Sequence, residues 1–279
     1  MSLNAPMRAL VVLVSALALL GGCGTAQKWT DQGDDLLRNN ALVEAENAYN
    51  RAIKADPHFA PALYGKGWTL YLSGHENLVP AARQLFARAI DYDPDYWGGY
   101  RGMGVLLLDE GKISPAERML RTAFEKNDRE PTVLLSLGQL YLRGGRFEEA
   151  IRLFEAAISL APERGEFLRF MAEVELRRGR HDEAIQWIIE GRALSVGGTS
   201  GLLLLDEGEL RIELDRAATL LRSATGPDDP RLKEALQSLG RADSLLEKAI
   251  QENERMSGAG QRRGYHERLR GQIQAAMGA

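Results

Sequence analysis

Small and bulky apolar residues recur in a fixed order between about residue 26 and residue 198 of the chain. One copy has the following residues, at offsets of 3, 7, 12, 16, 19 and 24 from the first: Gly138, Tyr141, Gly145, Ala150, Phe154, Ala157 and Pro162. The same offsets apply from Gly33 and Gly104 and more weakly from Ala172. The copy from Gly67 resumes three residues late, after an insertion at 75–80. Apolar residues three and four positions apart share one face of a helix. Each copy therefore predicts two helices joined by a turn, and the whole pattern predicts an all-α array.

These five copies in register resemble the tetratricopeptide repeat, a helix–turn–helix unit of about 34 residues. The resemblance implies a right-handed superhelical solenoid of five to six units, whose stacked helices leave a concave groove. It places the first five units at residues 29–198. In such a unit, a small residue lets two helices approach closely. A bulky residue four positions after the second-helix alanine fills the gap between neighbouring units.

After residue 198 the pattern changes to longer helices. Residues 202–224 and 231–255 predict two helices separated by the breaker sequence Gly226-Pro227-Asp228-Asp229-Pro230. The second carries an apolar stripe at helical spacing, formed by Leu232, Ala235, Leu236, Leu239, Ala242, Leu246, Ala249 and Ile250. We interpret 199–257 as an elongated sixth helical pair and 258–279 as a C-terminal capping helix that covers the open end of the array. A dedicated partner-binding helix is the alternative for this region.

The N-terminus has the layout of a secretory signal. Arg8 is followed by an uncharged apolar run at 9–20 and then by Gly21, Gly22 and Cys23. Twelve residues make about 18 Å of helix, which is too short to span roughly 30 Å of hydrocarbon. We therefore expect residues 1–22 to be a signal peptide. A short buried helix with an inert core cysteine is the alternative.

The sequence Leu20-Gly21-Gly22-Cys23 resembles the lipobox of bacterial lipoproteins. The resemblance implies a diacylglycerol on the Cys23 thiol, cleavage before Cys23 and acylation of the new amino terminus, with fatty acids such as palmitate. Residues 23–28 would then be a lipidated linker. Because Gly24 and not aspartate follows the cysteine, the resemblance favours an outer-membrane lipoprotein that faces the periplasm.

The tetratricopeptide resemblance also places groove-facing positions three residues before, one after and four after the small residue of each first helix. The predicted partner-binding residues are Tyr64, Trp68, Tyr71, Arg101, Val105, Leu108, Leu135, Gln139, Leu142 and Arg169, and the fifth unit continues with Glu173 and Leu176.

Three of these positions are aromatic and fall at i, i+4 and i+7: Tyr64, Trp68 and Tyr71. They predict a ligand surface, because tyrosine and tryptophan are enriched in interface hot spots. Ordinary packing between adjacent units is the alternative. Members of the family that clamp acidic chaperone tails have lysine and asparagine on the groove side of the first unit, where this chain has Thr30 and Asp34. We therefore expect an apolar or aromatic partner segment, extended or helical.

Composition and residue spacing argue against other chemistry. The chain of 279 residues has a formal net charge of −4, which disfavours nucleic acid as a partner. Its four histidines lack metal-ligand spacing, and Asp91, Asp93 and Asp95 lack the glycine that a calcium loop requires next. No catalytic motif is present in a suitable context. We therefore expect no metal, no cofactor and no enzyme activity.

Taken together, these patterns predict a non-catalytic scaffold that is anchored to the membrane through Cys23 and binds a protein or peptide segment in its groove. At the family level the chain is similar to lipoproteins that assist assembly of envelope complexes, including pilotin-like proteins for type IV or Tad pilus secretins. A secretin is thus one expected partner. The alternatives are an adaptor that recruits periplasmic hydrolases or proteases and a structural subunit of an export complex.

Overall fold

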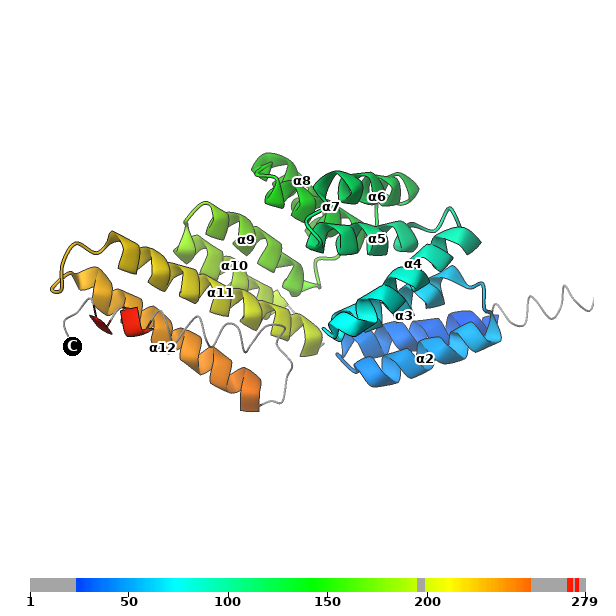
Figure 1. The fold of residues 1–279 in the computed structure, drawn as a ribbon, viewed down its shortest axis with the longest axis horizontal. Coiled ribbons are helices and arrows are strands. Elements are labelled where there is room, and N and C mark those ends of the chain that lie inside the picture. The colour runs from blue at the N-terminus through cyan, green and yellow to red at the C-terminus, as the bar shows by residue number, and fades with distance from the viewer. Residues whose placement is uncertain (1–23, 195–198, 252–269, 273, 276–279) are drawn as a thin grey trace, which may run out of the picture. The chain divides into compact units, whose positions relative to one another are not determined.

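The computed structural model describes residues 24–194, 199–251, 270–272 and 274–275, and within these ranges its regular structure is helical, without strands (Figure 1). This confirms the predicted all-α fold. The chain divides into two compact units, unit 1 up to Leu140 and unit 2 from Tyr141 onward. None of the helices in the described ranges has the length and apolar composition needed to cross a membrane.

Unit 1 is built from helices that pack against their sequence neighbours. Its elements are a helix over 24–38, α2 (Leu42–Ala55), α3 (Ala60–Leu72), the short 3₁₀ helix η1 (Glu76–Leu78), α4 (Val79–Tyr92), α5 (Trp97–Asp109), α6 (Ile113–Lys126) and most of α7 (Pro131–Arg143). α3 packs against α2, α4 and α5, and α5 packs against α4 and α6. The first helices of successive pairs, α3 and α5, therefore lie next to each other, as stacked helix pairs require.

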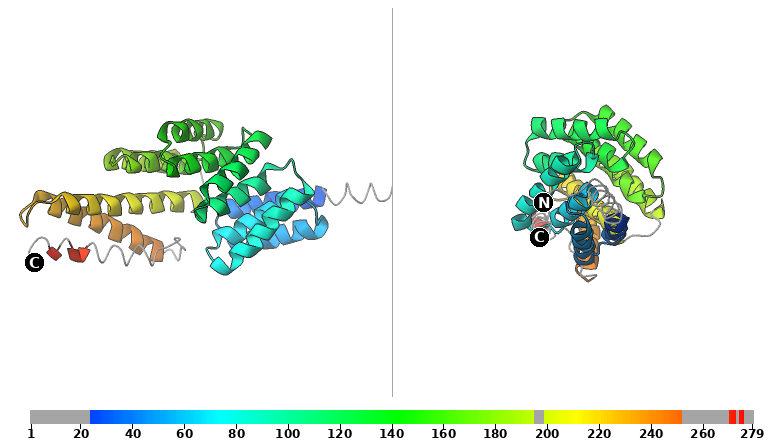
Figure 2. Two further views of the ribbon diagram at one scale, coloured as in Figure 1. Left: turned by 45° about the horizontal axis from the view of Figure 1, so that its top comes forward. Right: turned by 90° about the vertical axis from the view of Figure 1, so that its right-hand side faces the viewer.

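Unit 2 continues the pairing and ends in two longer helices. Its elements are the end of α7, α8 (Phe147–Leu160), the 3₁₀ helix η2 (Gly165–Phe167), α9 (Leu168–Arg177), α10 (His181–Leu194), α11 (Thr199–Ser223) and α12 (Pro230–Gln251). α11 and α12 run side by side (Figures 1 and 2). They share a core of Leu210, Leu214, Ala217, Ala218, Leu232, Ala235, Leu239, Ala242 and Leu246. Five members of the apolar stripe expected on the second helix therefore face α11: Leu232, Ala235, Leu239, Ala242 and Leu246.

The turns inside successive pairs repeat in the backbone itself. Each has one residue in the left-handed conformation, with φ between 58° and 74°: Asn40, Gly74, Gly111, Gly145 and Gly179. Glycine and asparagine adopt this conformation at the least steric cost, which explains their recurrence at helix ends. Successive positions are 34 residues apart, except for 37 residues between Gly74 and Gly111. The longer interval contains η1, which occupies the insertion expected at 75–80.

Bulky side chains of the second helices fill the gaps between pairs, as predicted. Tyr49 of α2 is fully buried, and a Cβ atom added to Gly33 would lie 2.6 Å from its ring. A Cβ added to Gly65, in the next pair, would come even closer to the same ring. Phe86 of α4 is enclosed in the same way by glycines of α3 and α5. One aromatic ring thus contacts both its own first helix and the following one.

Candidate binding surfaces

Three aromatic side chains lie along one face of α3 in unit 1. The ring centroids of Tyr64 and Trp68 are 6.2 Å apart, and those of Trp68 and Tyr71 are 5.1 Å apart. Leu63 and Leu70 lie on another face of α3, where they are buried in the hydrophobic core of the unit. The three rings pack against the edge of that core and remain half-buried. The three side chains thus take part in packing between neighbouring helix pairs, and the ligand surface stays a prediction.

Two further aromatic residues from the start of the next first helix join this group. The Tyr64 ring lies 5.9 Å from the Tyr96 ring and 5.4 Å from the Trp97 ring, both edge to face. Burial raises the pKa of the Tyr96 hydroxyl well above its ordinary value. The rule that places groove positions relative to the small residue of each first helix does not include Tyr96 or Trp97. Their adjacency just before a predicted helix was nevertheless a signal in the sequence. We call Tyr64, Trp68, Tyr71 and Trp97 the aromatic surface.

Arg101 of α5 connects three first helices beneath the aromatic surface. Its Nε donates hydrogen bonds to the Thr132 carbonyl oxygen and the Ser136 Oγ of α7, both at 2.9 Å. Its Nη1 donates to the Tyr64 hydroxyl, and its guanidinium carbon lies 4.1 Å from the Trp68 ring centroid. Only 8% of Arg101 is exposed. This arginine therefore orders α3, α5 and α7 in addition to lying at a predicted groove position.

The tyrosine hydroxyls of the aromatic surface are engaged within unit 1. Tyr71 donates a hydrogen bond to Asp109 Oδ2 at the end of α5. Burial raises the pKa of Tyr64, and the positive charge of Arg101 acts in the opposite direction. The rings are therefore held in place by polar contacts at their rims. Such pre-organisation reduces the entropy that a partner must overcome on binding.

The remaining predicted groove positions differ in exposure. Val105, Leu108 and Leu135 in unit 1 are 8%, 3% and 5% exposed, and Leu142 in unit 2 is 3% exposed. Gln139 on α7 is half-buried. The aliphatic members therefore contribute chiefly to packing of the free chain. The half-buried aromatic and polar members present the accessible surface.

In unit 2, Arg169 stands at the start of α9 without a hydrogen-bond partner for its buried Nε within the described chain. Its guanidinium carbon lies 4.0 Å from the Phe170 ring centroid. Burial lowers the pKa of Arg169, and the charges of Glu207 and Glu166 oppose that shift. The positive charge is therefore stabilised by nearby carboxylates and an aromatic ring.

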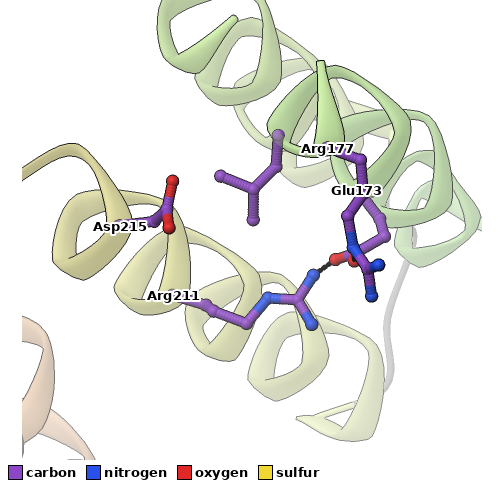
Figure 3. A pocket seen from close by; sticks show the side chains of 5 residues that line it. Glu173, Arg177, Arg211 and Asp215 are labelled. Atoms are coloured by element: carbon purple, nitrogen blue, oxygen red, sulfur yellow. Dashed lines mark hydrogen bonds and ion pairs between the residues drawn. The ribbon is translucent and has the colours of Figure 1, made fainter. Parts of the chain in front are cut away.

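A hollow of about 250 Å³ opens between α9 and α11, lined by Glu173, Leu176, Arg177, Arg211 and Asp215 (Figure 3). Two of these, Glu173 and Leu176, are the remaining groove positions predicted for the fifth tetratricopeptide repeat. Glu173 pairs with Arg177, at 2.9 Å between Nε and Oε1, and also with Arg211 across the two helices. The α11 wall was not expected, because the sequence pattern assigns no groove positions after residue 198.

Several predicted features lie outside the described residues. These are the lipobox Leu20, Gly21, Gly22 and Cys23, the signal peptide and most of 258–279. Lipidation and capping therefore stay predictions. Arg270, within the described part of the C-terminal segment, forms an ion pair with Asp243 of α12. Among the residues that the structure describes, no group of three or more histidine, cysteine, aspartate or glutamate side chains could hold a metal ion.

Comparison with known proteins gives one family match. The model of the tetratricopeptide repeat matches residues 30–96, 101–162 and 135–190, which together are more than half of the chain. The human protein O-mannosyl-transferase TMTC3 (Homo sapiens) is 27% identical over 135 residues, which are 45% of this chain and 14% of the human protein.

Solved structures with a similar fold include the following two. A chain of the APC/C hetero-tetramer Cut9–Hcn1 superimposes with a TM-score of 0.59 at 18% identity, over 88% of this chain and 43% of that one. TTC0263, a thermophilic tetratricopeptide repeat protein of Thermus thermophilus, gives 0.55 at 23% identity, over 66% of this chain and 99% of that one. At these identities the likeness concerns the fold alone. The chain also spans less than half the length of the human protein and of the Cut9–Hcn1 chain.

Proposed function

The chain belongs to the tetratricopeptide repeat family, and from this premise we propose that it is a non-catalytic scaffold of the cell envelope that binds a protein partner. Stacked helix pairs of this kind provide extended surfaces for protein–protein interaction. The observation that carries the proposal is the aromatic surface of unit 1.

The chemistry of the aromatic surface is that of an interaction hot spot. Trp68 and Tyr71 are large, half-buried and fixed by Arg101 and Asp109, so a partner would bind rigid rings. Tryptophan, tyrosine and arginine dominate the binding energy of protein interfaces. An apolar or aromatic segment of the partner, extended or helical, is the ligand that such rings suit.

A lipid anchor on Cys23 would place this scaffold at the outer membrane, facing the periplasm. The support is the sequence Leu20-Gly21-Gly22-Cys23 after a short apolar run. Each buried CH₂ group of an acyl chain contributes about 0.8 kcal/mol, so two or more chains give stable attachment. Replacing Cys23 by Ser should therefore release the protein from the membrane fraction. Continued attachment of the variant would contradict the anchor.

The anchor and the repeats together suit a factor that assists assembly of an envelope complex, such as the secretin of a pilus or secretion system. A photo-crosslinking amino acid at position 71, introduced in intact cells, should capture this partner. The same amino acid at Tyr92, an exposed tyrosine of α4 outside the aromatic surface, is the matched control. Equal capture of the partner from positions 71 and 92 would contradict the proposal that the aromatic surface binds it.

Deletion of the gene tests the assembly role separately. Loss of secretin multimers from the envelope is the expected result. Normal multimers, with altered hydrolase or protease activity instead, would overturn the assembly role and indicate an adaptor. A partner that stays stoichiometrically bound under harsh washing would indicate a permanent structural subunit.

A further inference from the structure

The hollow in unit 2 differs in chemistry from the aromatic surface of unit 1. Its charged lining side chains form two groups, with Glu173, Arg177 and Arg211 on one side and Asp215 on the other (Figure 3). Leu176 is the apolar residue of the lining. Pockets for drug-sized ligands measure about 300–1,000 Å³. An open hollow of about 250 Å³ is smaller and suits one or two side chains of a partner better than a whole cofactor.

Glu173 holds two arginines at the rim of the hollow. The side chain of Glu173 is 15% exposed, whereas those of Arg177 and Arg211 are each 49% exposed. The carboxylate thus lies beneath the two guanidinium groups and contacts both. Its single negative charge leaves this group with a net charge of +1, and the charge that reaches solvent is mainly positive.

On the other side of the hollow, a single carboxylate, that of Asp215, is accessible to solvent. The Asp215 side chain is 47% exposed, and its Oδ2 lies 3.0 Å from Nε2 of His181 at the start of α10. Two half-exposed guanidinium groups therefore face one half-exposed carboxylate. Leu176 packs against the core of Ala172, Ala184, Ile188, Leu205 and Ile212, so its position is fixed.

From this arrangement we infer that the hollow binds an acidic side chain of the protein partner, with an adjacent aliphatic side chain of the partner against Leu176. A carboxylate can accept hydrogen bonds from guanidinium groups of both helices, and charge-assisted bonds of this kind are about twice as strong as neutral ones. The inference rests on the proposed function as a protein-binding scaffold. It adds a second contact whose chemistry is acidic and aliphatic, where the aromatic surface takes an apolar segment.

Peptide titration of the full chain tests this inference. The probes are acetyl-Leu-Glu-Leu-Glu-Leu-amide and its neutral counterpart with glutamine in place of glutamate, monitored by amide chemical shifts of α9 and α11. The acidic peptide should bind about tenfold or more tightly than the neutral one, since 1.4 kcal/mol corresponds to a factor of ten. The double variant Arg177→Gln, Arg211→Gln should lose this preference. The double variant Arg118→Gln, Arg152→Gln, at exposed positions of α6 and α8, removes two positive charges elsewhere and should keep it.

Three results would overturn the inference. One is equal binding of the two peptides, and another is a preference that survives the double variant in a chain with an unchanged circular dichroism spectrum. The third is tighter binding of the lysine counterpart of the peptide, lost in Asp215→Asn, which would assign the hollow to a basic side chain. If the chain binds the acidic and neutral peptides equally while position 71 still captures a partner in cells, the inferred acidic contact is wrong. The proposed function as a protein-binding scaffold is then unaffected.

Discussion

Arg101 is the residue through which three first helices of unit 1 are joined. Replacing it by Leu removes the donors to Tyr64, Ser136 and the Thr132 carbonyl oxygen while keeping an apolar side chain of moderate size. Hydrogen bonds to charged groups contribute about 1.5–3 kcal/mol, and buried partners left without a donor add to the cost. We expect the free energy of unfolding, measured by urea denaturation, to fall by about 3 kcal/mol.

The control for Arg101 is Arg118, an exposed arginine of α6. Arg118→Leu should change the free energy of unfolding by no more than about 0.5 kcal/mol. Equal effects of the two substitutions would mean that the buried network around Arg101 contributes nothing specific to the stability of unit 1.

Trp68 carries the residue-scale prediction for binding. Trp68→Ala removes the ring at the middle of the aromatic surface and should weaken binding of the partner captured from position 71 by about 2 kcal/mol or more. Isothermal titration with that partner measures the loss, and circular dichroism checks that the helices persist. Leu72→Ala, at an exposed position of the same helix, should leave the affinity unchanged. Unaltered affinity of Trp68→Ala, or its unfolding, would reject the surface.

Helical spacing alone brings Tyr64, Trp68 and Tyr71 onto one face, so this part of the site was predictable from the sequence. The burial of Arg101 was not. Its three hydrogen-bond partners lie 31, 35 and 37 residues away along the chain, and their approach depends on how closely α3, α5 and α7 stack. The contact between Trp97 and Tyr64 was not predictable for the same reason, since it forms between consecutive helix pairs, although the adjacent aromatic residues Tyr96 and Trp97 are visible in the sequence.

At the scale of the helices, glycines decide how closely neighbouring elements approach. A Cβ on Gly99 of α5 would lie 3.0 Å from the Phe86 carbonyl oxygen and 3.1 Å from the Ile90 nitrogen, both backbone atoms of α4. Gly99→Ala must therefore displace a helix, and overpacking of this kind costs about 1–3 kcal/mol. Gly240 of α12 has open space around it, so Gly240→Ala should stabilise by about 0.5–1 kcal/mol through helix propensity. Thermal unfolding distinguishes the two, and a shift of equal sign would contradict the role of close approach.

The turn before α12 predicts a pH dependence. The Asp229 carboxylate accepts hydrogen bonds from the Arg231 side chain and from the backbone N–H groups of Thr225 and Arg231. These contacts hold the pKa of Asp229 far below its ordinary value, with the Arg231 side chain as the largest cause. Because the charged form is favoured in the folded chain, its stabilising effect is present above the ordinary pKa and is lost as the pH falls through the lowered one.

Asp229→Asn tests this dependence. The difference in urea midpoint between the wild type and the variant should be largest at pH 7 and should shrink between about pH 5 and pH 2. Asp228→Asn, at the exposed neighbouring position, should lower the midpoint little at any of these pH values. A difference for Asp229→Asn that is the same at pH 7 and pH 2 would show that the carboxylate charge has no part in holding the turn.

The order of the helices and their turns was predictable because each depends on local chemistry. Three kinds of residue recur at fixed positions of each repeat and can be recognised in the sequence. They are the small residues where helices cross, the bulky residues four positions after an alanine, and the glycine or asparagine residues with φ above zero. The partners of α11 were harder to predict. Its contacts with α9 involve Glu173 and Arg211, a pairing that follows from the packing angle and that no offset within one repeat contains.

At the scale of the whole molecule, the energetics should follow those of a repeat array. Within each unit, the helices pack chiefly against helices close in sequence, and unit 1 and the α11–α12 pair each have a core of their own. The stability of such an array is approximately a sum of terms from single repeats and from neighbouring pairs. A change in one unit is therefore expected to be felt most strongly within that unit.

The four tryptophans allow this expectation to be measured in one chain. Trp29, Trp68 and Trp97 lie in unit 1, and Trp187 lies on α10 in unit 2. In protein labelled with 5-fluorotryptophan, fluorine NMR follows each ring separately through urea unfolding, with Trp187→Phe assigning its signal. Gly99→Ala should lower the midpoint reported by Trp68 and Trp97 and leave that of Trp187 nearly unchanged, because the lost packing lies between α4 and α5. Equal shifts of the urea midpoint at all four tryptophans would instead mean that the chain unfolds as one cooperative body. A substitution at any helix–helix contact would then destabilise the aromatic surface and the hollow together.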